Sequence, residues 1–217
     1  MSRQTSCVAR SARSRKSYHH GDLRASLLDA AVELIAERGL HGLSLRECAR
    51  RAGVSHAAPY RHFADKDALL LAIARRGFEL LTRTGVAAMR GVEDPRDRLD
   101  AYGVAYVRFA VDNPVLFRVM FTAEIEEPEP ESEPEPEPES QDHTGRAFEL
   151  LMEAAAAVVG EDSEQAQELA AVASWSLPHG LAMLILDGRI PAEQASTPDE
   201  AEDLARKILA QWRGPLS

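Results

Sequence analysis

Residues 42–70 read GLSLRECARRAGVSHAAPYRHFADKDALL and hold the most informative pattern in this chain of 217 residues. Ser44 stands three residues before Glu47, which is the spacing of a capping box at the start of a helix. Apolar residues then recur at helical spacing: Leu45, Cys48, Ala49 and Ala52. Gly53 interrupts this stripe, and Ser55 is placed to cap a second short helix. The stretch therefore predicts two short helices joined by a tight turn, as in a helix-turn-helix.

The segments on either side continue the helical pattern. A helix is expected over 21–38, because its apolar residues share one face: Leu23, Leu27, Leu28, Ala31, Leu34 and Ile35. Gly39 follows it as a left-handed C-cap. Asp65 can cap a further helix that continues beyond Gly77. In a helix-turn-helix the first helix braces the second, expected here over 55–63, so that its first side chains reach the major groove of DNA.

The charge of the chain is divided unevenly along its length. The formal net charge is -10, which by itself disfavours DNA as a partner. Residues 1–66, however, hold 12 Lys or Arg against 6 Asp or Glu, whereas residues 67–217 hold 13 against 29. Salt screens charges beyond about 10 Å, so the positive N-terminal part governs attraction to phosphates. Residues 1–20 are expected to form a disordered basic arm, which either attracts phosphates or only solubilises the chain.

The stretch 42–70 resembles the signature of the TetR/AcrR family of transcriptional regulators almost throughout, and the helix over 21–38 resembles the first helix of that family. The resemblance implies an all-α fold of about nine helices. A three-helix helix-turn-helix DNA-binding domain at 21–66 is then joined to a helical ligand-binding and dimerisation domain at 67–217. It also implies DNA contacts from ten residues: Ser44, Arg46, Ser55, His56, Ala57, Ala58, Tyr60, Arg61, His62 and Lys66.

These residues differ in the contact that the resemblance implies. Tyr60, His62 and Lys66 are similar to the family's phosphate contacts, whereas Arg46 is able to reach a guanine edge. Pro59 departs from the family pattern, because a leucine is usual at this position. Since proline lacks an N–H and crowds the preceding turn, the second helix is expected to start one residue late or with a 3₁₀ turn.

The C-terminal part predicts further helices and one insert. Asp94-Pro95 and Asn113-Pro114 each place an N-cap before a proline at the first helical position, and so open two helices. Residues 124–140 read EIEEPEPESEPEPEPES, which indicates an extended, solvated insert, either an inert linker or a binding segment. Three more helices are expected at about 142–159, 163–187 and 198–213, with Pro178 distorting the middle one.

Aromatic and methionine side chains lie on the helical stripes of this part. Each can be ordinary core, but together they can line an apolar ligand cavity: Phe78, Tyr102, Tyr106, Phe109, Phe117, Met120, Phe121, Phe148, Met152, Trp175 and His179. Residues 175–183, WSLPHGLAM, resemble the Trp-His-Gly signature of one C-terminal class within the family. His179 is then either the polar anchor of the cavity, one turn from Trp175, or a structural histidine bonded to a backbone carbonyl near Pro178.

Several classes of protein are disfavoured by what the sequence lacks. No apolar run reaches the roughly 18 residues of a membrane span, and the N-terminus lacks the apolar core of a signal peptide, so a cytoplasmic protein is expected. Cys7 and Cys48 are isolated, which disfavours a disulfide framework and a metal site. No nucleophile–base pair stands out, so we expect neither catalytic residues nor a cofactor, and no enzyme.

These observations lead to one hypothesis with two alternatives. A homodimer, formed through the last two helices, binds a palindromic operator in double-stranded DNA and acts as a repressor that a small, largely apolar ligand releases. The alternatives are a DNA-binding regulator without a ligand and an activator.

Overall fold

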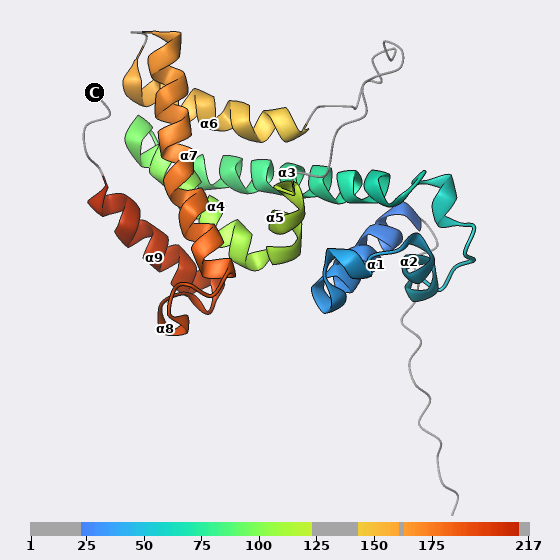
Figure 1. Cartoon of the computed structure of the whole chain (residues 1–217). Coiled ribbons are helices and arrows are strands. Elements are labelled where there is room, and N and C mark those ends of the chain that lie inside the picture. The colour runs from blue at the N-terminus through green and yellow to red at the C-terminus, as the bar shows by residue number, and fades with distance from the viewer. Residues whose placement is uncertain (1–22, 123–142, 161–162, 213–217) are drawn as a thin grey trace, which may run out of the picture.

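The computed structural model describes residues 23–122, 143–160 and 163–212, where every regular element is a helix (Figure 1). The α-helices are α1 Leu23–Arg38, α2 Leu45–Arg51, α3 Lys66–Met89, α4 Pro95–Asp112, α5 Pro114–Met120, α6 His143–Val159, α7 Glu164–Leu186, α8 Ala192–Ala195 and α9 Pro198–Gln211. Two 3₁₀ helices, η1 Leu40–Gly42 and η2 Pro59–Arg61, lie in the N-terminal part. The predicted all-α fold is confirmed. The basic arm at 1–20 and the insert at 124–140 fall outside the described residues.

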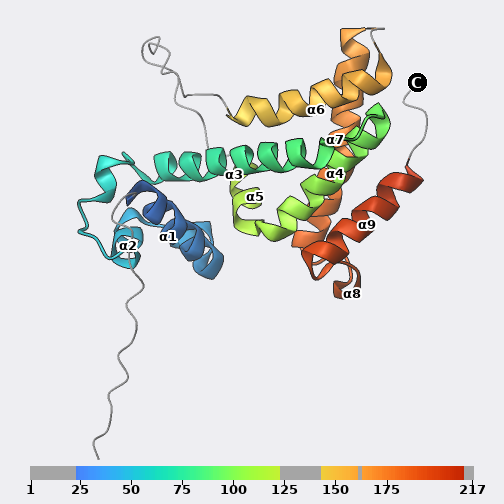
Figure 2. The same ribbon diagram turned by 180° about the vertical axis from the view of Figure 1, so that it is seen from behind.

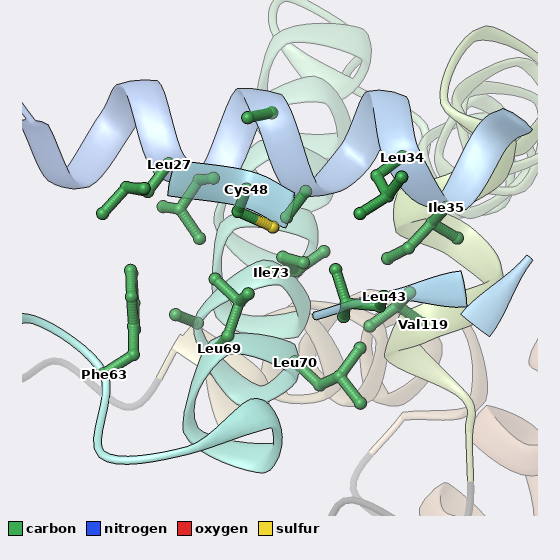
Figure 3. Packing of buried hydrophobic residues seen from close by; sticks show 14 of the residues in the cluster. Leu27, Leu34, Ile35, Leu43, Cys48, Phe63, Leu69, Leu70, Ile73 and Val119 are labelled. Carbon is green, nitrogen blue, oxygen red and sulfur yellow. The ribbon is translucent and has the colours of Figure 1, made fainter. Parts of the chain in front are cut away.

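An N-terminal unit forms around the shared core of α1, α2 and the start of α3. Figure 3 shows Leu27 and Leu34 of α1, Cys48 of α2, and Leu69 and Ile73 of α3 pointing toward one another. All five side chains are fully buried. Burying each such leucine or isoleucine contributes about 1.5–3 kcal/mol, so the unit holds a defined shape. That shape fixes the position of the exposed segment between α2 and α3.

The long helix α3 belongs to both halves of the molecule. It begins in the N-terminal unit and extends along the C-terminal helices, with α6 beside it (Figures 1 and 2). The predicted boundary at residue 66 therefore falls where this continuous helix begins. Helix α4 packs against α3, α6, α7 and α9. Gly85 allows the closest part of the α3–α4 contact, because a Cβ there would lie 2.6 Å from Cδ2 of Tyr102.

Most helix ends follow the predicted capping residues. Ser44, Asp65 and Asp94 each accept a hydrogen bond from the backbone N–H three residues later, at 3.2, 2.8 and 2.9 Å. Gly39 and Gly53 have positive φ values of 70° and 72°, which glycine adopts without strain, but the ψ of 177° places Gly39 outside the left-handed helical conformation predicted for it. The predicted starts of α2, α3 and α4 are confirmed, and α1 and α2 end just before Gly39 and Gly53 as predicted.

Several features of the helix ends and connections differ from expectation. Asn113 precedes α5 but does not cap it with its side chain, because its amide donates 3.2 Å back to the carbonyl oxygen of Phe109. The capping box at α2 is only half formed, since the Glu47 carboxylate accepts hydrogen bonds from Arg50 instead. The short helix α8 was not predicted, because its four residues are too few for a periodic pattern. By contrast, the middle C-terminal helix, α7, contains Pro178 within its length, as the sequence predicted.

Candidate DNA-binding and effector sites

The segment after α2 takes the form that Pro59 imposes. Because Pro59 has no N–H, the carbonyl oxygen of Ser55 cannot accept the hydrogen bond of an α-helix from position 59. It accepts one of 3.0 Å from Ala58 instead, and a 3₁₀ turn follows at η2, where the N–H of His62 donates 2.9 Å to Pro59. The predicted helix over 55–63 is therefore wrong in type, whereas the expectation of a 3₁₀ turn caused by proline is confirmed.

The residues predicted to contact DNA are mostly open to solvent. Tyr60 is 52% exposed although its ring is large. The other exposed members of the set are Ser44, Arg46, Ser55, His56, Ala57, Arg61 and His62, whereas Ala58 and Lys66 are half-buried. They run from Ser44, the N-cap of α2, to Lys66, the first residue of α3. Pro59 and Phe63 face the other way and are buried, which anchors the turn.

Ion pairs separate two groups of basic residues around this segment. Arg50 donates hydrogen bonds of 2.9 and 2.6 Å to Glu47, which lower the pKa of that carboxyl to about 2. Arg51 donates 2.9 Å to Glu37 of α1. Arg46, Arg61 and Lys66, by contrast, form no ion pair with any part of the chain that the structure describes. The second group keeps its charge available for phosphates.

A cavity of about 230 Å³ lies between α3, α4, α6, α7 and the end of α5. We call it the aromatic cavity, and its lining residues are Phe78, Leu81, Tyr102, Tyr106, Phe121, Ala147, Phe148, Leu151 and Trp175. Phe148 is 44% exposed, so the cavity reaches the surface at α6. The sequence predicted its six aromatic lining residues. It missed the three others, whose aliphatic side chains carry no signal that separates a cavity wall from ordinary core.

The remaining predicted ligand residues lie beside the cavity rather than in its wall. Phe109, Phe117 and Met120 are buried in the adjoining core, and Met152 packs against the neighbouring cluster of α4, α6 and α7. His179 contacts the lining rings, with its centroid 5.4 Å from that of Trp175 and 4.8 Å from that of Phe121. The predicted placement of Trp175 and His179 on one helical face is thus confirmed.

A hydrogen-bonded chain joins three of these side chains. The indole N–H of Trp175 donates 3.1 Å to the hydroxyl of Tyr106, whose oxygen lies 2.8 Å from Nδ1 of His179. Burial lowers the pKa of His179, which favours the neutral ring. We therefore assign the Tyr106 hydroxyl as donor to Nδ1 and place the ring proton on Nε2. The partner of Nδ1 is thus a tyrosine and not the backbone carbonyl considered from the sequence.

The tyrosine hydroxyls of the cavity wall are satisfied within the chain. Tyr102 donates 3.0 Å to the carbonyl oxygen of Ala147 on α6. Burial raises the pKa of both Tyr102 and Tyr106, so neither hydroxyl ionises at neutral pH. The wall therefore presents rings and aliphatic groups, with its polar atoms already paired.

Comparison with known families agrees with this architecture. A family model described as "Bacterial regulatory proteins, tetR family" matches residues 27–73, and one described as "Tetracyclin repressor-like, C-terminal domain" matches residues 99–211. The chain belongs to the TetR family. It is accordingly a DNA-binding transcriptional regulator, and its N-terminal unit is the helix-turn-helix of that family.

Curated relatives of this TetR-family chain match over about half of their length or less. The HTH-type transcriptional activator FasR of Mycolicibacterium smegmatis is 36% identical over 106 residues, 48% of this chain and 48% of that protein. The HTH-type transcriptional regulator BetI of Rhizobium meliloti is 38% identical over 78 residues, 36% of this chain and 38% of that protein. The chain thus spans about half or less of the length of these relatives.

Solved structures match the TetR-family chain over nearly its whole length. A protein of unknown function from Rhodococcus sp. RHA1 is 32% identical with a TM-score of 0.68, and the match covers 94% of this chain and 100% of that one. The TetR family transcriptional regulator PfmR from Thermus thermophilus is 24% identical with a TM-score of 0.59, covering 87% and 95%. The second likeness concerns the fold alone.

Proposed function

We propose that this TetR-family chain is a homodimeric repressor that leaves its operator when a small, largely apolar molecule enters the aromatic cavity. The observation that carries the proposal is the position of α5. Its Leu116 and Val119 belong to the core of the N-terminal unit, whereas Phe117 and Met120 belong to the core beside the cavity. A ligand that shifts the rings around Phe117 would therefore also move the helix that packs against the DNA-reading unit.

The proposed DNA contacts follow from exposure and charge. Arg46 at the start of α2 and Arg61 in η2 are the candidates for base edges, with His56 beside them. Tyr60, His62 and Lys66 are the candidates for phosphates, together with Ser44. Lys66 is the first residue of α3, where unpaired backbone N–H groups also favour an anion. Ser55, Ala57 and Ala58 complete the proposed surface through polar or apolar contact.

The proposed dimer uses α7 and α9. Leu169 and Val172 of α7 are 65% and 50% exposed, and Trp212 after α9 is 75% exposed. Among the described helices, α7 is the one long and apolar enough to cross a membrane, yet only 28% of its apolar 18-residue stretch is buried in the single chain. A second copy that covers this face would bury it, and a two-fold dimer suits a palindromic operator. We place such a regulator in the cytoplasm.

The aromatic cavity is preferred over a larger crevice as the effector site. The crevice, of about 350 Å³, lies between α1 and the corner of α4 and α5, and its walls carry the charged groups of Asp29, Glu33, Arg76 and Asp112. Arg76 there donates 2.6 Å to Asp29, so the crevice is bridged by an ion pair between α3 and α1. The aromatic cavity has the apolar wall that a small-molecule site requires, and its existence favours a ligand-responsive regulator over one without a ligand.

Selection of bound sequences from random duplex DNA tests the proposal. We expect a palindromic sequence with half-sites about one helical turn apart. Placing that sequence over a promoter should lower expression of a reporter, and small apolar molecules should restore it. A rise in expression without ligand would instead assign an activator, as FasR is described to be. If no duplex is preferred over random competitor, the proposed operator recognition is wrong.

A further inference from the structure

We propose that the aromatic cavity accepts an uncharged molecule about the size of a substituted benzene ring and rejects the same shape when it carries a charge. This inference rests on the proposed effector role of the cavity and adds the chemical class of the effector. Three features of the cavity wall support it: its charge, its size and the arrangement of its rings.

The wall offers no counter-charge to a ligand. None of its nine residues is acidic or basic. Its polar side-chain atoms are the hydroxyls of Tyr102 and Tyr106 and the indole N–H of Trp175, and each is bonded within the chain. A carboxylate or ammonium in the cavity would give up hydration without gaining a charged partner among these residues, which disfavours its binding. A hydrocarbon has no such hydration to lose, so the wall selects against charge.

The size of the cavity limits the ligand to one ring with small substituents. Apolar protein cavities of roughly 150 Å³ bind benzene, so a cavity of about 230 Å³ leaves room for a few further carbon atoms. A long acyl chain needs more space than this. A short, compact ligand is therefore favoured over a lipid-like one.

The rings of the wall are arranged to pack around another ring. Phe78 and Phe121 meet edge to face with centroids 5.8 Å apart, and Phe148 and Trp175 do so at 6.3 Å. These are the separations at which aromatic pairs attract, and a bound ring would extend the same pattern. Ring faces also attract quaternary ammonium ions, which makes a cation the main rival ligand. The absence of any acidic residue among the wall residues that the structure describes decides for the neutral molecule.

The pKa directions agree with this choice. Burial raises the pKa of Tyr102 and Tyr106 and lowers that of His179, so the surroundings keep all three groups uncharged. An environment that disfavours ionisation of its own side chains disfavours an ionised ligand for the same reason.

A fluorescence titration with isosteric probes tests the inference without DNA. The chain has two tryptophans, and Trp212→Phe leaves Trp175 in the cavity wall as the only one. We expect tert-butylbenzene to change the Trp175 emission saturably, and phenyltrimethylammonium, which has the same shape and one positive charge, to bind at least about a hundredfold more weakly. Isopropylbenzene and benzoate form the matching pair for negative charge, with the same expected order. Equal or tighter binding of either ion overturns the inference.

A cavity-filling variant shows whether the signal comes from this site. In the Trp212→Phe background, Leu151→Phe adds a ring to the wall and should abolish the response to tert-butylbenzene, while the far-ultraviolet circular dichroism shows that the helical fold is kept. A response that survives Leu151→Phe, or no response to either hydrocarbon in the parent protein, overturns the inference. If the hydrocarbons bind without lowering operator affinity, the inference of a neutral, ring-sized ligand is supported and the proposed release from the operator is contradicted. The failure of one proposal can therefore be told from the failure of the other.

Discussion

The guanidinium of Arg118 in α5 donates a hydrogen bond of 2.8 Å to the carbonyl oxygen of Leu186, the last residue of α7. It also donates 2.7 Å to the carboxylate of Asp187. The last carbonyls of a helix lack partners within the helix, and a cation there is favourable. This contact joins the helix proposed for the dimer to the helix whose Leu116 packs into the N-terminal unit.

Replacing Arg118 should reduce the effect of the ligand on operator affinity more than it reduces the stability of the fold. Both partners of the ion pair are over 40% exposed, so Arg118→Ala should lower the free energy of unfolding by no more than about 1 kcal/mol. We expect the variant to bind the selected operator but to lose much of the change in operator affinity caused by tert-butylbenzene. Arg98→Ala, an exposed arginine of α4, is the control. If tert-butylbenzene changes operator affinity equally in the two variants, the Arg118 contact does not couple the cavity to DNA binding.

Lys66 should contribute to DNA affinity without contributing to sequence preference. Lys66→Ala removes one phosphate partner from each subunit and so two from the proposed dimer, so binding to every duplex should weaken and the slope of log affinity against log salt should flatten by about two units. Fluorescence anisotropy over a range of salt concentrations measures this slope. Arg90→Ala, at the other end of α3, should leave it unchanged. A slope that Lys66→Ala does not alter would remove Lys66 from the phosphate contacts.

Pro59 should determine how the exposed residues after α2 meet the bases. Pro59→Leu restores an N–H that can donate to the Ser55 carbonyl, so the 3₁₀ turn should become α-helical and rotate His56 and Arg61. We expect the bound sequences selected by this variant to differ from those of the parent at one or two positions per half-site. Arg46→Ala serves for comparison, because its loss should alter preference at a single base by about 1–3 kcal/mol. Identical preferences for Pro59→Leu and the parent would contradict this role.

Gly85 should be required for the close contact between α3 and α4. A methyl group there meets the ring of Tyr102, which is held by burial and by its bond to Ala147. Gly85→Ala is therefore expected to cost about 1–3 kcal/mol in urea unfolding. Gly180→Ala in α7 is the matched control, since its Cβ meets nothing within 4 Å and alanine is the better helix former by about 0.5–1 kcal/mol. Similar unfolding midpoints for the two variants would be inconsistent with tight packing at Gly85.

His179 should make the protein less stable in acid. Burial lowers its pKa below the usual value of about 6.5, so between these two values the unfolded chain binds the proton more readily than the folded one. At higher pH the ring is neutral in both states and does not affect the free energy of unfolding. As the pH drops below about 6.5, that free energy falls. We expect the melting temperature of His179→Asn to fall less than that of the parent between about pH 7 and pH 5. His41→Asn, at an exposed position, should keep the parent profile, and a parent-like profile for His179→Asn would exclude this role.

The sequence predicted features that local chemistry determines. Asp65 and Asp94 cap their helices because the carboxylate and the N–H it accepts from are three residues apart, and Pro59 produces a 3₁₀ turn because its own backbone lacks a donor. The contact of Tyr106 with His179 joins residues 73 positions apart, and no local pattern encodes it. For the same reason Leu81 and Leu151 were not recognised as cavity wall, since only the packed helices decide which apolar face borders a void.

Because α3 is one continuous helix, a small tilt at one end produces a larger displacement at the other. Its 24 residues form one rod that starts at Lys66 and ends beyond the cavity. At 1.5 Å per residue such a rod is about 36 Å long, so a tilt of roughly 5° about its far end displaces its start by about 3 Å. That displacement is close to the roughly 3.4 Å between successive base pairs. In the proposed dimer, a slight rotation inside the C-terminal half would therefore shift the two DNA-binding units away from the spacing of successive major grooves, with no helix having to unfold.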